Sequence, residues 1–123
     1  MVTSSIEWIL IVSGVATAAG GLVACFFPQP VLRLVFGVKN TDRITMLFIR
    51  HWGALLFVVC GLTVYSAYFP ATRAPILTAA VIEKFAIVVL IVFGPAKRTA
   101  AMTALAVMDG TLAILFVKYL AGL

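Results

Sequence analysis

The chain has 123 residues, of which 64% are hydrophobic and 11% charged, and its mean hydropathy is +1.22. Soluble domains are about 45–50% apolar and about 25% charged, so this composition excludes an ordinary soluble enzyme and indicates one membrane domain, residues 1–123. The net charge of +5 does not indicate nucleic-acid binding, because most lysines and arginines stand at the ends of apolar runs.

The first apolar run, about residues 6–27, predicts a membrane-spanning helix. It has Glu7 near its start in place of the basic residues of a signal peptide, so we expect it to be retained. Pro28 and Pro30 end it, because proline cannot continue a helix cheaply. Small residues recur on one face and predict close contact with a second helix: Gly14, Ala18 and Gly21.

The longest connection, residues 28–43, contains a short apolar segment, residues 31–37. This segment is interrupted by Arg33 and closed by Gly37, so it is too short to span a bilayer. We expect a turn or short helix lying on the headgroups. Thr41 or Asp42 is then expected to cap the helix that follows.

Three further spans are predicted at about residues 44–69, 75–94 and 99–120. All five prolines lie outside the centres of the apolar runs, so the helix breakers agree with the hydropathy. The loops between the last three spans have only about four or five residues, which favours antiparallel neighbours. The sequence therefore predicts an all-α integral membrane four-helix bundle with antiparallel up-down topology.

Basic residues predict the orientation of this bundle, since cytoplasmic loops carry an excess of lysine and arginine. Five lie in or beside the connections 28–43 and 95–98: Arg33, Lys39, Arg43, Lys97 and Arg98. Only Arg73 and Lys118 belong to the other side. We expect loops 28–43 and 95–98 in the cytoplasm, both termini outside, and a location in the bacterial inner membrane.

Ionisable residues inside three of the spans are the candidate functional residues: Arg50, His51, Glu83, Lys84 and Asp109. With a rise of about 1.5 Å per residue, their Cα atoms lie roughly 10–16 Å from the cytoplasmic helix ends. They can therefore share one layer near the bilayer centre. Ionisable groups at this depth mark substrate or proton sites by default, although a buried ion pair can also serve only to fix helix register.

Small residues beside Arg50, Glu83 and Asp109 indicate that these three side chains turn inward and form an ion triad. Whether the layer is functional or only structural, we expect replacement of Arg50 by alanine to reduce accumulation or folding of the protein severely. His51 and Lys84 are rotated by about 100° from their neighbours, so we expect them at the edge of a cavity or facing another protomer.

The function predicted from this layer is binding of, or acid–base chemistry on, a lipophilic small molecule such as a lipid, an isoprenoid or a quinone. His51 is the expected base, and Glu83 or Asp109 the acid. Arg50 and Lys84 would bind substrate oxygens, and Trp52 would stack on the ligand. Bound quinone apart, no cofactor is predicted, and no metal site.

Two alternatives remain open. In the first, the protein is an accessory structural subunit of a membrane complex, and the charged layer only fixes helix packing. In the second, it is a small proton-coupled transporter. Membrane lipids are expected partners in each case, together with further copies in a homo-oligomer or the subunits of a larger complex; nucleic acid is not. Cys25 and Cys60 lie in separate apolar runs and are expected to behave as small buried hydrophobic residues.

The layout resembles that of the DoxX-like membrane proteins and neighbouring small four-helix families. The shared features are Phe27-Pro28 at the end of the first span, Phe36-Gly37 at the end of the link, and Arg50-x-x-Gly53 opening the second span. The resemblance implies a four-helix bundle that serves as an accessory subunit of a membrane oxidoreductase or acts as an orphan protein without such a partner. It carries over only Arg50 and Gly53 as pattern positions and assigns no role to the charged residues of the last two spans.

Overall fold

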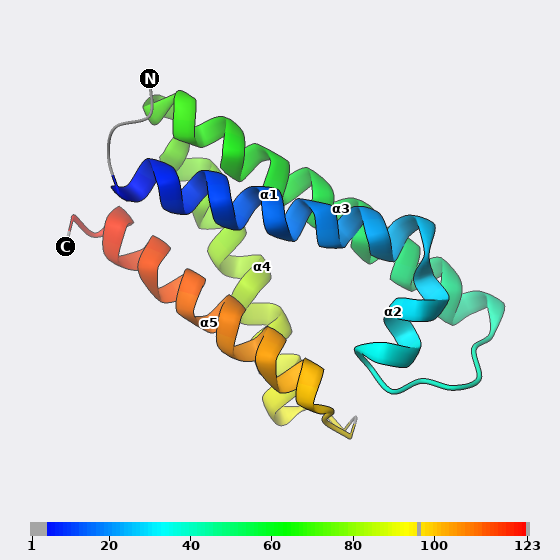
Figure 1. Cartoon of the computed structure of the whole chain (residues 1–123). Coiled ribbons are helices and arrows are strands. Elements are labelled where there is room, and N and C mark those ends of the chain that lie inside the picture. The colour runs from blue at the N-terminus through cyan, green and yellow to red at the C-terminus, as the bar shows by residue number, and fades with distance from the viewer. Residues whose placement is uncertain (1–4, 96, 123) are drawn as a thin grey trace.

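The computed structural model describes residues 5–95 and 97–122. In these ranges the chain forms helices and no strand (Figure 1): α1 (Ser5–Phe26), α2 (Pro28–Leu34), α3 (Arg43–Tyr68), a 3-10 turn η1 (Pro70–Thr72), α4 (Arg73–Phe93) and α5 (Ala100–Leu120). The predicted all-α class is confirmed. Four of the helical segments are long and apolar enough to cross a membrane: Ser5–Phe26, Arg43–Tyr68, Pro70–Phe93 and Ala100–Leu120.

Local chemistry accounts for where the helices begin. The carboxylate of Asp42 accepts a hydrogen bond of 2.7 Å from the Thr45 backbone N–H, so Asp42 caps α3 as predicted. Thr99 caps α5 in the same way, accepting from the Met102 N–H at 3.0 Å. The short helix begins at Pro28, three residues earlier than the apolar segment 31–37 suggested. The reason is that proline, which cannot continue α1, is well suited to the first turn of a new helix.

Close contact between α1 and α3 depends on glycine. A Cβ atom at Gly21 would lie 2.6 Å from the Gly53 carbonyl oxygen, and one at Gly53 would lie 2.5 Å from the Gly21 carbonyl oxygen. At Gly14 a Cβ would lie 2.9 Å from the Cys60 carbonyl oxygen. Any side chain at these positions would push the backbones apart. The small-residue face predicted for the first helix is therefore confirmed as its contact face.

The helices form two pairs, with α1 lying along α3 and α4 along α5 (Figure 1). The pairs meet near the ends of the chain around a core that all four long helices supply: Leu10, Ala67, Leu77, Ala80 and Phe116. Toward α2 the pairs separate in Figure 1. There the Thr99 hydroxyl donates to the Val35 carbonyl oxygen and joins the start of α5 to the end of α2.

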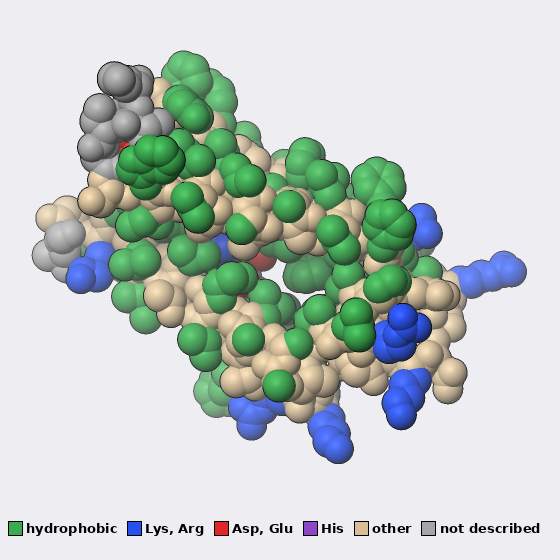
Figure 2. Space-filling view, viewed as in Figure 1, with side chains coloured by type: hydrophobic (Ala, Val, Ile, Leu, Met, Phe, Trp, Pro, Cys, Tyr) green, Lys and Arg blue, Asp and Glu red, His purple; other side chains and the backbone are tan. Residues whose placement is uncertain are grey.

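The distribution of side chains is the reverse of that in a soluble bundle. Large apolar residues cover the outer faces of the helices (Figure 2), among them Val15, Leu55, Val58, Ile82 and Leu90. Charged side chains, in contrast, are buried at three positions of the described chain: Arg73, Lys84 and Asp109. Helix hydroxyls donate to carbonyls of their own helix, as Ser13 does to Ile9 and Thr63 to Val59. An exposed apolar surface of this extent is typical of helices that contact lipid or other proteins.

Candidate functional site

Three charged side chains from α4 and α5 form a buried ion cluster, consisting of Glu83, Lys84 and Asp109. The ammonium Nζ of Lys84 lies 3.6 Å from Asp109 Oδ1 and 3.9 Å from Glu83 Oε2. Lys84 and Asp109 are almost fully enclosed, with side-chain exposures of 3% and 5%, while the Glu83 side chain is 24% exposed. The Oε2 atom of Glu83 is buried without a hydrogen bond, so only the more distant lysine charge compensates it.

Lys84 is inside the bundle because it lies on the face of α4 that packs against the other helices: Arg73, Leu77, Ala80, Lys84 and Ile91. The prediction placed Glu83 on that face and Lys84 to one side. Successive residues of a helix are rotated by about 100° about its axis. A prediction that takes the wrong face of α4 as the buried one therefore places Glu83 inside and Lys84 at the side, the reverse of what is observed. Ala79 and Ala86, two of the small residues beside Glu83 at helical spacing, are both exposed, so that side of α4 is not its packing face.

The predicted pairing of Arg50 with Glu83 and Asp109 is wrong. Arg50 is exposed on α3 and forms no ion pair among the described residues, and His51 beside it is also exposed. The buried face of α3 instead runs through Ile49, Gly53, Leu56, Cys60 and Thr63. Gly61, 11 residues beyond Arg50 on α3, has no atom within 4 Å of where its Cβ would be, so α3 packs against nothing at that position.

An apolar pocket of about 350 Å³ leads to Asp109. Four helices line it, together with the segment that follows α2: Ala16, Thr17, Gly20, Val23, Val31, Val35, Trp52, Leu56, Leu105, Met108 and Asp109. Asp109 is the charged member of this lining, and Trp52 contributes an aromatic ring that packs edge-on against Phe36 at 5.9 Å between centroids. The structure thus brings Trp52 and Asp109 to one pocket and leaves Arg50 and His51 outside it.

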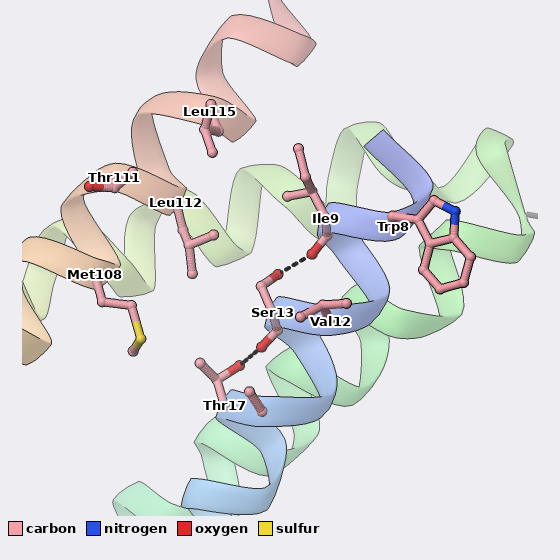
Figure 3. A pocket seen from close by; sticks show the side chains of 10 residues that line it. Trp8, Ile9, Val12, Ser13, Thr17, Met108, Thr111, Leu112 and Leu115 are labelled. Carbon is pink, nitrogen blue, oxygen red and sulfur yellow. Dashed lines mark hydrogen bonds between the residues drawn. The ribbon is translucent and has the colours of Figure 1, made fainter. Parts of the chain in front are cut away.

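A wider groove of about 620 Å³ lies between α1 and α5 and opens to the surface (Figure 3). Its hydroxyl groups donate to carbonyl oxygens of their own helices: Ser13 donates to Ile9 and Thr17 to Ser13, each at 2.6 Å, and Thr111 donates to Val107 at 2.8 Å. The groove and the pocket have Ala16, Thr17 and Met108 in common. In Figure 2 a hollow opens between the helix pairs, with acidic atoms at its edge. An apolar path therefore leads from the surface toward Asp109.

A second charged cluster, which the sequence analysis missed, lies at the end of α3. The Arg73 guanidinium donates to the carbonyl oxygens of Ser66 and Ala67, each at 2.8 Å, and to the Tyr119 hydroxyl at 3.1 Å. Its Nη2 lies 4.0 Å from Glu7 Oε1. Arg73 thus holds α1, α3 and α5 together. The sequence did carry one sign of this role, because Arg73 lies only five residues past Tyr68, the last residue of α3. An arginine at that distance can donate to the carbonyl groups that the end of a helix leaves unpaired.

The chemistry that this site offers is narrow. A carboxylate at the base of an apolar pocket can hold a cation or accept a hydrogen bond from a ligand, and Lys84 keeps that carboxylate in place. Among the described residues no group of three or more histidine, cysteine, aspartate or glutamate side chains could hold a metal ion.

Comparisons of the chain with protein families, with curated proteins and with solved structures found no match. The resemblance to the DoxX-like proteins therefore stays a prediction. The class that the fold defines is an all-α protein with four helices long and apolar enough to cross a membrane.

Proposed function

We propose that this is an integral membrane protein whose four long helical segments each cross the bilayer once. At about 1.5 Å per residue, helices of 21 to 26 residues extend over roughly 32–39 Å, slightly more than the hydrocarbon layer of about 30 Å. The apolar outer surface and the internal pairing of hydroxyl groups support this proposal.

The same proposal includes an antiparallel up-down arrangement in the bacterial inner membrane, with both termini outside. It is supported by the exposed basic residues around α2 and the start of α5: Arg33, Lys39, Arg43, Lys97 and Arg98. Figure 2 shows most blue side chains at that end of the molecule. Arg73, at the opposite end, is buried among carbonyl oxygens and is not a free basic group.

Within the membrane, the protein binds a lipophilic small molecule of the lipid, isoprenoid or quinone type. The observation that carries this proposal is the apolar pocket that ends at the nearly enclosed Asp109. The molecule enters sideways from the lipid through the groove between α1 and α5, which has lining residues in common with the pocket. Apolar pockets with a few polar groups are typical of small-molecule sites.

Three residues have defined roles in this binding site. Asp109 contacts the polar group of the ligand, and Lys84, which is not part of the pocket lining, holds Asp109 in place through their ion pair. Trp52 packs on the ligand from the side of α3. The exposed position of His51 supports binding over acid–base catalysis, because His51 would need to be within hydrogen-bond reach of the ligand to act as a base.

The test uses two matched glycine substitutions. Gly20 lines the pocket, and a Cβ there would meet nothing within 4 Å, so the backbone can accept a side chain and Gly20→Leu reduces the space for a ligand. Gly61→Leu adds the same side chain at an equally open site that lines neither the pocket nor the groove. We expect mass spectrometry of purified protein to find a lipophilic molecule with wild type and Gly61→Leu and to lose it with Gly20→Leu. Equal amounts in all three would contradict the proposal.

A second candidate is the accessory structural subunit. The near-complete burial of the Lys84–Asp109 pair favours it, since such a pair also fixes the register of two helices. In that case a helix of another subunit occupies the groove between α1 and α5. Under this alternative, Gly20→Leu and Gly61→Leu purify alike without a bound molecule, and both still assemble with the partner complex.

A further inference from the structure

The ion cluster has one more acidic group than basic groups. With Glu83, Lys84 and Asp109 all ionised, the charges −1, +1 and −1 leave a net charge of −1. An uncompensated charge in a low-dielectric interior costs several kcal/mol, by an order-of-magnitude estimate. The site must therefore acquire one positive charge, either as a proton or as part of a bound ligand.

Among residues 5–95 and 97–122, no further cation forms an ion pair with the cluster. Cys60 is a titratable group on the buried face of α3, and a free cysteine thiol supplies no positive charge in either protonation state. Arg50 and His51 of α3, like Arg33 of α2, are exposed and take no part in the ion pairs of the described chain. Within α1, Glu7 lies next to Arg73 instead.

The pocket lining favours a cationic ligand over a quinone. A quinone presents two oxygen atoms that accept hydrogen bonds, but the hydroxyl of Thr17 already donates to Ser13, which leaves the indole N–H of Trp52 as the side-chain donor that the lining offers. Lys84 is not part of the lining and is occupied by two carboxylates. The charged group that the lining offers is the acceptor Asp109, and the ring of Trp52 can attract a cation to its face.

We propose that the molecule bound in this pocket is a lipophilic monocation, such as a protonated amine or a quaternary onium ion, which takes the place of one proton on the Glu83–Lys84–Asp109 cluster. This inference rests on the proposed function and specifies the class of ligand. In the empty site one carboxyl carries a proton, and the arriving cation releases it to solvent. The net charge of the occupied site is then zero.

This exchange makes binding depend on pH. Over the range in which the empty site holds its proton, affinity for the cation rises by about ten-fold per pH unit, since one proton leaves for each cation bound. An anion of the same shape has the opposite electrostatic preference and is excluded.

The experiment compares two probes of nearly the same shape and opposite charge, tetraphenylphosphonium and tetraphenylborate. The full-length protein is placed in nanodiscs of zwitterionic lipid, and binding is measured by equilibrium dialysis from pH 5 to pH 8 against empty nanodiscs. We expect saturable binding of the phosphonium, tighter than that of the borate by at least about ten-fold. Release of one proton per bound cation is measured in unbuffered solution.

Variants locate the effect. Glu83→Gln and Asp109→Asn each remove the excess negative charge, so both should abolish the preference for the cation and its pH dependence. Glu83 is partly exposed, so Glu83→Gln provides the test if Asp109→Asn fails to fold. Asp42→Asn is the matched control, because it also neutralises a carboxylate but lies at the exposed start of α3 and should bind the phosphonium like wild type.

The outcomes separate the two proposals. Should both probes bind equally, and should Gly20→Leu prevent both from binding, the pocket binds lipophilic molecules but the cationic class is wrong. The class is also wrong if phosphonium binding is independent of pH or unchanged in Glu83→Gln. If neither probe binds above the level of empty nanodiscs, the cationic class is wrong. The binding function itself is overturned if, in addition, mass spectrometry finds no lipophilic molecule with the wild-type protein.

Discussion

The ammonium group of Lys84 lies 3.6 Å from the carboxylate of Asp109, and the two side chains are enclosed between α4 and α5. They are separated by 25 positions in the sequence and belong to different proposed spans. The same lysine lies 3.9 Å from Glu83, so one cation serves two carboxylates. The ion pair therefore connects α4 to α5, and its Asp109 side chain is also part of the lining of the apolar pocket.

Removing the lysine should destabilise the protein. In Lys84→Met, both carboxylates lose their cation while remaining largely enclosed, and breaking a buried pair costs about 3–5 kcal/mol. We expect a clearly lower melting temperature in detergent. Because the cost comes from the uncompensated charge, the double variant Lys84→Met with Asp109→Asn should recover part of the loss. A single variant that melts like wild type would show that the ion pair contributes nothing.

A comparison of two arginines tests which of them organises the fold. Arg73→Ala removes three hydrogen bonds from a charged donor, each contributing about 1.5–3 kcal/mol, so we expect a loss of at least about 3 kcal/mol in unfolding free energy. Arg50→Ala, at an exposed position, should change it by no more than about 0.5 kcal/mol. This reverses the expectation from the sequence. Equal effects of the two substitutions in a denaturation series would contradict the assignment.

The contact between α1 and α3 can be tested by adding single methyl groups. Gly21→Ala places a Cβ against the Gly53 carbonyl oxygen, and overpacking of this kind costs about 1–3 kcal/mol. Gly61→Ala meets nothing and should be neutral, or stabilising by up to about 1 kcal/mol through its helix propensity. Thermal melting of the two variants side by side measures the difference. Similar melting temperatures would mean that the helices are not in close contact at Gly21.

The cap of α3 should depend on pH. The hydrogen bond from the Thr45 backbone N–H holds the pKa of Asp42 below its ordinary value. The cap therefore contributes fully at pH values above the ordinary pKa of aspartate, and this contribution is lost as the pH falls through the lowered pKa of the folded state. In wild type, the protection of the amides of residues 44–46, measured relative to their intrinsic exchange rate at each pH, should decrease in that acidic range. Asp42→Ala should exchange faster at neutral pH as well, while Asp42→Asn, which can still accept the bond, should remain protected there.

Local features of the structure could be predicted from the sequence because they depend on neighbouring residues. The ends of the helices follow from prolines and caps such as Pro28 and Asp42. The contact face of α1 follows from the spacing of Gly14 and Gly21. The inward position of Asp109 also follows, because small residues such as Ala113 accompany it on α5.

The partner of Asp109 could not be predicted in this way. Both Arg50 and Lys84 are cations at suitable depth, and a rotation of about 100° about the helix axis decides which of them faces inward. Small residues flank both candidate faces of α3, but only the face through Gly53 meets α1. The buried position of Arg73 could not be predicted for a related reason. Its hydrogen-bond acceptors are the backbone carbonyl groups of Ser66 and Ala67, and every residue type has such a group.

By itself the sequence determined that this protein is all-helical, that four of its segments are long and apolar enough to cross a membrane, and where each of them starts and stops. These properties depend on hydropathy, breakers and caps, which act within a few residues. Only the tertiary structure decided that Lys84 rather than Arg50 neutralises Asp109, and that the pocket reaches this carboxylate from between α1 and α5. Such pairings depend on the rotation and separation of whole helices, which are set by how they pack against each other.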